Sequence, residues 1–125
     1  MGKRSTRQKR AIDQVIQEAK GPLSAQDIQT AASALCPRLS LATVYRVVRD
    51  GAEAGELSVV HLEDNVARYE VAGGNHHHHF LCHCCSRVFD ILLPCNVVAD
   101  FAPTDFQVTR HEITLFGSCP DCVVS

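Results

Sequence analysis

The sequence lacks any uninterrupted apolar run long enough to cross a bilayer, which takes about 20 residues. Its first ten residues, Met-Gly-Lys-Arg-Ser-Thr-Arg-Gln-Lys-Arg, lack the apolar stretch of a secretory signal. We therefore expect a cytoplasmic protein with no membrane partner. The sequence also has no internal repeat, no H-E-x-x-H pair and no zinc-deaminase signature, and the last two absences argue against a small metal-dependent enzyme.

Charge is divided unevenly along the 125 residues, although the net charge is only -2. Residues 1–49 carry nine basic and three acidic side chains, whereas residues 50–125 carry three basic and eleven acidic ones. A basic half joined to an acidic half indicates that the first half meets a polyanion. A solvated basic arm with no partner fits the same charges, so composition leaves both interpretations open.

Apolar periodicity predicts three helices followed by a β-hairpin in the first half of the chain. The helices are expected over residues 6–19, about 25–36 and 40–54, and the hairpin strands over 57–62 and 67–71. Three helices and a hairpin are the outline of a winged helix-turn-helix.

Polar and glycine residues mark the ends of these helices. Ser24 and Asp27 form a capping-box pattern before the second helix, which should end at Cys36 because a proline follows. Ser40 can cap the third helix, and Gly55 can terminate it in a left-handed conformation.

The second half of the chain is predicted to be a small α+β domain. A hinge at residues 73–75 separates a first domain, 1–72, from a second, 76–125. Strands are predicted over 80–81, 88–93 and 106–116, with a short helix over 96–101. A domain this small needs a covalent or metal staple, or a partner, to be stable.

Seven cysteines are many for a chain of this length, and four of them form two C-x-x-C pairs. Cys82 and Cys85 make the first pair, and Cys119 and Cys122 make the second, with 33 residues between the two pairs. Two such pairs complete a tetrahedral shell of four thiolates, which suits zinc and would fasten the first strand of the domain to its end. An iron–sulfur cluster and a pair of disulfides are the competing interpretations. Cys84, between the ligands of the first pair, is expected to be a spare thiol.

Four consecutive histidines follow the hinge, at residues 76–79. In an extended segment His77 and His79 face one side and the other two face the opposite side, so the run can supply two ligands to each of two sites. Glu70 and Asp90 could add carboxylates to the first site.

Of the remaining histidines, His111 is the strongest candidate ligand. It is expected to share a strand face with Ile113 and Leu115. A lone histidine on such a face is usually a core residue, but the other histidines nearby favour a ligand here. His61 and His83 have no comparable support and are interpreted as surface or structural residues.

The ordered set of motifs is similar to that of the ferric uptake regulator family. The resemblance runs through Ser-Leu-Ala-Thr-Val-Tyr-Arg at residues 40–46, Arg-Tyr-Glu at 68–70, the histidines at 76–79, the first cysteine pair, and His-Glu-Ile-Thr-Leu-Phe-Gly-Ser-Cys-Pro-Asp-Cys at 111–122. It covers nearly the whole chain, and the order and spacing of the motifs make it specific.

The resemblance implies a homodimeric, metal-dependent transcriptional repressor. An N-terminal winged helix would bind operator DNA, and a small C-terminal α/β domain held by a four-cysteine zinc would dimerise. By position, the structural zinc ligands are Cys82, Cys85, Cys119 and Cys122. The regulatory metal ligands are Glu70, His77, His79 and Asp90. A further site takes His76, His78 and His111, with Cys95 or Asp100 in place of a family glutamate that aligns with Val97.

The chain departs from the family at one position that affects the choice of regulatory metal. A sensory histidine often precedes the second helix in the family, and Pro22 occupies that position here. This loss, the short basic N-terminus and a Cys95 thiolate resemble the zinc-sensing branch. Glu70 and Asp90 instead resemble the iron- and manganese-sensing branches. We expect Zn2+, with Fe2+ or Mn2+ sensing and peroxide sensing as alternatives.

The DNA-binding residues are predicted from the winged-helix interpretation. Thr43 and Tyr45 would touch phosphates or thymine methyl groups, and Arg46 a phosphate or a guanine edge. Sequence-independent attraction to phosphates would come from Arg4, Arg7, Lys9 and Arg10. Two other classes of function compete with a regulator: a small zinc metalloenzyme, and a zinc-ribbon module that does not sense metal.

Overall fold

A computed structural model describes residues 3–73, 77–93 and 99–123 of the chain. The chain divides into two compact units, Met1–Gly74 and Asn75–Ser125. The predicted hinge at 73–75 falls at this division, although residues 74 and 75 lie outside the described part, and its role as a hinge stays a prediction. Among the described residues no helix is long and apolar enough to span a membrane.

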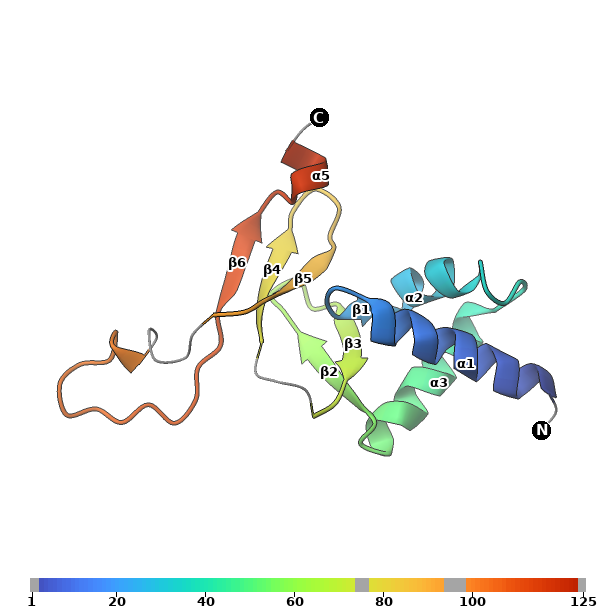
Figure 1. Ribbon diagram of the computed structural model, residues 1–125, viewed down its shortest axis with the longest axis horizontal. Helices are drawn as coiled ribbons and strands as arrows, with labels where there is room; N and C mark the ends of the chain where they lie inside the picture. The colour runs from blue at the N-terminus through green and yellow to red at the C-terminus, as the bar shows by residue number, and fades with distance from the viewer. Residues whose placement is uncertain (1–2, 74–76, 94–98, 124–125) are drawn as a thin grey trace. The chain divides into compact units, whose positions relative to one another are not determined.

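The first unit contains three helices and a small antiparallel sheet (Figure 1). Its elements are α1 (Lys3–Glu18), β1 (Leu23–Ser24), α2 (Ala25–Ala32), α3 (Leu41–Glu53), β2 (Leu57–His61) and β3 (Ala67–Val71). The sheet order is β1-β3-β2, with β2 and β3 forming the hairpin and β1 pairing with the other edge of β3. The predicted three helices and hairpin are therefore confirmed.

The apolar faces of the three helices form the core of the first unit. Ile12 of α1, Ile28 of α2, and Val44 and Val48 of α3 are fully buried against one another. At Gly51 an added Cβ would lie 2.9 Å from a side-chain carbon of Leu57, so a larger residue there would require the Leu57 side chain of β2 to shift. This core fixes the angle at which α3 is presented on the surface.

The predicted helix caps are present, and one helix end differs from the prediction. Ser24 Oγ accepts a hydrogen bond from the Asp27 N–H at 3.1 Å, and Asp27 Oδ2 accepts from the Ser24 N–H at 3.3 Å. Gly55 follows α3 with a φ of +79°. However, α2 ends at Ala32 rather than near Cys36, because the Ala34 and Leu35 N–H groups donate to carbonyls three residues back, at 3.3 and 2.9 Å, and the chain tightens into turns.

A buried ion pair closes the hairpin. The guanidinium of Arg68 on β3 is only 2% exposed and donates to both carboxylate oxygens of Asp64 in the hairpin loop, at 3.0 and 2.8 Å. This contact lowers the pKa of Asp64 below its ordinary value of 3.8. The pair thus anchors the loop to the middle of the sheet through two charge-assisted hydrogen bonds.

Replacing Asp64 with asparagine is expected to lower the free energy of unfolding by about 2 kcal/mol at neutral pH, because both charged hydrogen bonds are weakened. Since the folded pKa is lowered, the stabilisation is complete above the ordinary pKa and is lost as the pH falls through the folded value. The difference between wild type and variant, measured by urea unfolding, should therefore shrink towards acid.

Asp50→Asn is the matched control, because Asp50 pairs with Arg49 at 3.7 Å on an exposed surface. It should change stability by less than about 0.5 kcal/mol at any pH. Equal losses of unfolding free energy in the two variants would mean that the buried pair contributes no more to stability than an exposed pair does.

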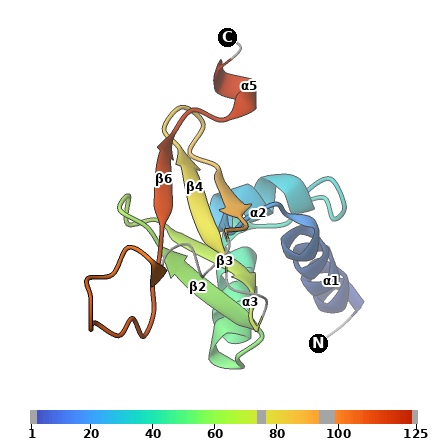
Figure 2. The same ribbon diagram turned by 60° about the vertical axis from the view of Figure 1, so that its left-hand side comes forward.

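The second unit is a three-stranded sheet followed by a short helix (Figure 2). Its elements are β4 (His78–Cys82), β5 (Val88–Ile91), β6 (Thr114–Gly117) and α5 (Pro120–Val123). The central strand β4 pairs antiparallel with β5 and parallel with β6. This order places the end of the histidine run opposite β5 and brings the end of β4 beside the end of β6.

One predicted strand of this unit is shorter in the structure, and one predicted helix lies mostly outside the described residues. The strand predicted over 106–116 is wrong in length, because β6 starts only at Thr114, the partner of His79. Phe106 and Val108 satisfy the alternation but are 69% and 48% exposed, and within the described ranges no strand pairs with them. The helix predicted over 96–101 falls mostly outside the described residues.

Candidate metal centres and nucleic-acid interface

The four predicted cysteine ligands gather at one end of the β4–β6 pair. Cys82 ends β4, Cys85 lies in the turn after it, and Cys119 and Cys122 follow β6. All four sulfurs lie within 4.8 Å of one another, with Sγ–Sγ distances of 3.7 Å for Cys82–Cys122 and 3.8 Å for Cys85–Cys119. A tetrahedral ion with metal–sulfur bonds of about 2.3 Å needs sulfurs about 3.8 Å apart. The donor set and its spacing therefore fit one tetrahedral ion, and these separations are too long for a disulfide of about 2.05 Å.

Local backbone geometry presents the first pair of sulfurs. The turn after Cys82 is closed by the Cys82 N–H donating to the Arg87 carbonyl at 3.0 Å and the Ser86 N–H donating to the Cys82 carbonyl at 2.9 Å. Ser86 takes a left-handed φ of +64° to complete it. The turn leaves the N–H of Cys85 directed at Cys82 Sγ, at 3.5 Å.

The pKa values of the thiols indicate that the cluster is suited to bind a cation. The backbone N–H groups of Cys85 and Cys119 lower the pKa of Cys82 to about 6. The Arg87 side chain lowers the pKa of Cys85. The pKa of Cys122 is instead raised, first by its hydrogen bond with the Cys84 thiol and then by burial. Four thiolates can share this space only when a positive ion neutralises them.

Part of the predicted regulatory site is assembled within the second unit. His79 on β4 stands opposite Asp90 on β5 in the strand register, with His79 Nε2 3.5 Å from Asp90 Oδ1. Nδ1 of His77 lies 3.5 Å from Asp90 Oδ2. These distances exceed a direct hydrogen bond but suit donors that share one ion. Glu70, the fourth predicted ligand, lies half-buried on β3 of the first unit.

The predicted further site is described only in part. His78 is 1% exposed, and its ring lies 5.0 Å from that of His111, centroid to centroid. His78 Nδ1 accepts a hydrogen bond from the Ile113 N–H at 3.2 Å, which leaves Nε2 as the nitrogen that can face an ion. His76 and Cys95 lie outside the described residues, and Asp100 is exposed. His111 itself lies in a segment without regular structure, not on the predicted strand.

The predicted DNA-binding side chains of α3 are accessible. Tyr45 is 46% exposed and Arg46 is also exposed, whereas Thr43 is partly buried and its Oγ accepts from the Ser40 hydroxyl at 2.9 Å. The Ser40 Oγ in turn caps the helix by accepting from the Thr43 N–H at 3.1 Å. Tyr45 and Arg46 are therefore the better placed of the three to reach DNA.

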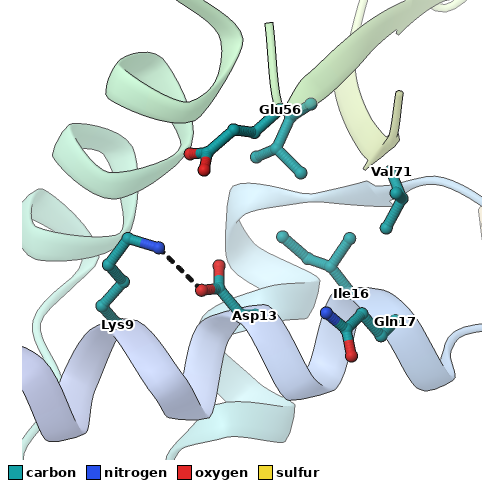
Figure 3. A pocket seen from close by; sticks show the side chains of 7 residues that line it. Lys9, Asp13, Ile16, Gln17, Glu56 and Val71 are labelled. Carbon is teal, nitrogen blue, oxygen red and sulfur yellow. Dashed lines mark hydrogen bonds and ion pairs between the residues drawn. The ribbon is translucent and has the colours of Figure 1, made fainter. Parts of the chain in front are cut away.

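The basic residues of α1 differ in their surroundings. Arg7 and Arg10 are exposed, and Arg4 lies in the first turns of the helix. Lys9 forms an ion pair with Asp13 at 2.8 Å, at the edge of a hollow that Glu56 also lines (Figure 3). Asp13 raises the pKa of Lys9 through this contact. Lys9 thus offers less uncompensated charge to a polyanion than its neighbours.

Two arginines that lie beside the candidate sites were not singled out as site residues from the sequence. Arg87 donates from Nε to Cys85 Sγ at 3.2 Å and from a terminal nitrogen to Cys119 Sγ at 3.4 Å, contacts that join segments distant in sequence. Arg38, two residues before the cap of α3, has a left-handed φ of +70° and borders a hollow of about 320 Å³ together with Arg7. An arginine so close to a predicted recognition helix was a signal available in the sequence.

Comparison with known proteins identifies the family. The profile of the Ferric uptake regulator family matches residues 1–116. The chain belongs to the ferric uptake regulator family. Its members are regulators, so the metalloenzyme alternative is rejected, and the predicted α+β fold beginning with a winged helix is confirmed.

Individual relatives support the same assignment and differ in the signal that their names give, which is peroxide in one case and a metal in the others. The chain is 31% identical to the peroxide-responsive repressor PerR of Staphylococcus saprophyticus over 97% of its own length and 83% of that protein. It is 30% identical to the structure of FurB from M. tuberculosis, a zinc uptake regulator, with a TM-score of 0.56 and coverage of 97% and 96%. A zinc-bound manganese uptake regulator has the same fold, with a TM-score of 0.77, 20% identity and coverage of 90% and 87%.

Proposed function

We propose that this chain is a metal-dependent transcriptional repressor that binds operator DNA as a homodimer when its regulatory site is loaded, and that the metal it senses is zinc. The observation that carries the proposal is the cluster of His77, His79 and Asp90 directly after the winged-helix unit. A ligand set at this point of the chain is the part of the molecule best suited to couple an ion to DNA binding.

The four-cysteine cluster would hold a structural zinc. Its ligands come from the two ends of the second unit, so an ion there fastens β4 to the segment after β6. The unit has few buried apolar side chains among its described residues, namely Leu81 and Val88 besides two of the cysteines. Metal binding would therefore contribute directly to its folding free energy.

The regulatory site would draw ligands from both units. Glu70 from β3 would join His77, His79 and Asp90, and an ion bound to all four would favour one orientation of the winged helix relative to the second unit. Only metal that distinguishes between orientations can change the affinity for DNA. The domain boundary at residues 73–75 and its role as a hinge are part of this proposal.

The donor set bears on which ion is sensed. Two imidazoles and two carboxylates suit zinc, but the carboxylates also suit iron(II) or manganese. Pro22, where the family often has a histidine, is fully buried and has no donor atom to offer. PerR and FurB, at almost equal identity, carry the names of a peroxide-responsive and a zinc-responsive regulator. Peroxide, iron or manganese sensing is the alternative.

Exposed apolar side chains in the second unit support its role in dimerisation. They include Leu92, Phe101, Phe106, Leu115 and Phe116, with exposed fractions from 43% to 79%. A stable monomer of this size seldom leaves so many large apolar side chains in water. The second copy of the chain would cover them.

The DNA interface would include Arg38 as a phosphate contact beside Arg7. A left-handed arginine is strained, and such strain concentrates at functional positions.

Replacing Arg38 with asparagine, which tolerates this backbone, is expected to weaken operator binding about five-fold and to lower the salt slope by about one. Arg110→Asn, which removes an arginine paired with Glu112 in the second unit, is the control and should leave both unchanged. An unchanged salt slope in the Arg38 variant would contradict the phosphate contact.

The proposal is tested by metal titration of DNA binding. An operator is first selected from random duplex DNA with the metal-loaded protein, and its affinity is measured at buffered zinc, iron(II) and manganese(II). Zinc should raise the affinity most. A stronger effect of iron or manganese would assign the chain to another branch, and loss of iron-dependent binding on peroxide treatment would indicate peroxide sensing. Affinity that does not depend on metal would leave a non-sensing zinc module.

A further inference from the structure

Arg87 joins the two halves of the cysteine cluster. It lies two residues after Cys85 and contacts Sγ of that residue through Nε at 3.2 Å. A terminal nitrogen of the same guanidinium lies 3.4 Å from Cys119 Sγ and 2.9 Å from Asp121 Oδ2. One side chain therefore contacts a sulfur from each C-x-x-C pair and a carboxylate from α5, the helix that begins after Cys119 and carries Cys122.

The orientation of the guanidinium is held from two further directions. Asp121, on α5, forms an ion pair with it, and the ring of Phe89 on β5 lies under its central carbon at 5.3 Å. The planar fork of arginine can direct several N–H groups to different acceptors at fixed angles, which a lysine cannot do. The half-exposed side chain is thus placed by contacts with β5 and α5 rather than by burial.

The contacts of Arg87 can offset the negative charge of a four-thiolate metal site. A divalent ion with four thiolates carries a net negative charge, which a nearby cation and N–H donors offset. Cys82 receives backbone N–H groups from Cys85 and Cys119, at 3.5 and 3.3 Å. Cys85 and Cys119 receive the side-chain N–H groups of Arg87. Groups that support metal ligands in this way usually affect metal retention about 10–100-fold.

We infer that Arg87 is a positioning residue of the structural metal site, which holds the sulfurs of Cys85 and Cys119 together and slows loss of the ion. This inference rests on the proposed metal occupancy of the cluster and adds the residue that sets its kinetic stability. Neither the cysteine spacing nor the family resemblance assigned a role to this position.

The test compares metal release from full-length Arg87→Met, Arg87→Lys and wild type. Arg87→Met should transfer its zinc to a chromogenic chelator about ten-fold faster. Arg87→Lys should recover only part of the difference, because a single ammonium lacks the separate, rigidly placed nitrogens with which the guanidinium contacts Cys85, Cys119 and Asp121. Arg110→Met, which removes another exposed arginine of the second unit and its ion pair with Glu112, is the matched control and should match the wild type.

A spectroscopic measurement separates positioning from general destabilisation. In the cobalt(II)-substituted protein the thiolate-to-cobalt charge-transfer band should move to longer wavelength in Arg87→Met, because loss of the N–H donors raises the energy of the sulfur electrons. A merely structural role would leave the band where it is. Wild-type band position and release rate in Arg87→Met, or complete recovery in Arg87→Lys, would overturn the inference.

Failure of this inference can be told apart from failure of the proposed function. Metal content of the wild type is measured first. If wild type holds one zinc per chain and Arg87→Met has the same release rate and band position, only the role of Arg87 is disproved. If wild type purified under reducing conditions holds no metal, the structural site itself falls, and the role of Arg87 falls with it.

Discussion

Replacing Cys119 with serine is expected to remove the structural metal and to destabilise the second unit by about 3 kcal/mol or more. Cys119 is 1% exposed, and its sulfur is one of four in a cluster. Among the described residues of this unit, Leu81 and Val88 are the buried apolar side chains besides cysteines, so the cluster has little apolar core beside it. Loss of one thiolate weakens the whole shell, and metal binding in so small a unit is also folding energy. Elemental analysis should show less than one zinc per chain, and thermal unfolding should begin at lower temperature.

Cys84→Ser is the matched control for this change. Cys84 lies in the same turn as the first pair but is exposed and outside the four-sulfur cluster. Its variant should keep one zinc per chain and the unfolding temperature of the wild type. If Cys84→Ser lost the metal and Cys119→Ser kept it, the ligand assignment would be wrong.

Replacing His77 and His79 together with alanine is expected to abolish the effect of metal on operator binding. Coupling between an ion and DNA is typically worth about 5–150-fold in affinity, and the double variant should show almost none of it. The fold should survive, since the His79 N–H donates to the Ile113 carbonyl at 3.0 Å whatever the side chain. The variant should therefore keep its structural zinc and its weak, metal-independent affinity for DNA. Fluorescence anisotropy of labelled operator, with and without metal, measures this.

His61→Ala is the control for the double variant, because His61 is an exposed histidine on β2 of the winged-helix unit. It should retain the full response to metal. A double variant that still responds like the wild type would move the sensory site elsewhere, and the pair of His78 and His111 would be examined next.

Much of the winged helix could be predicted because its signals are local. Helical periodicity in residues 6–19, the capping box at Ser24 and Asp27, and the left-handed Gly55 each depend on neighbours a few positions away. The end of α2 was missed because the Ala34 and Leu35 N–H groups shift to carbonyls three residues back, which ends the regular helix before the proline does.

The second unit was predicted less well because its structure depends on pairing between distant segments. The alternation over 106–116 predicts a long strand, but only the part from Thr114 has a partner in β4. The four cysteines that gather in one cluster could be selected by the spacing of the two C-x-x-C pairs. Arg87 could not, since its contact with Cys119 Sγ exists only once β4 and β6 lie side by side.

If the proposed function holds, metal in the regulatory site and operator DNA favour the same conformation of the protein. The most direct test is to measure the metal affinity of the wild-type protein with and without saturating operator. We expect one ion per chain whose affinity does not depend on DNA. We expect a second ion to bind more tightly in the presence of operator, by the same factor of about 10–100 by which it tightens DNA binding. A single ion per chain, or a second ion whose affinity the operator leaves unchanged, would contradict the proposed function.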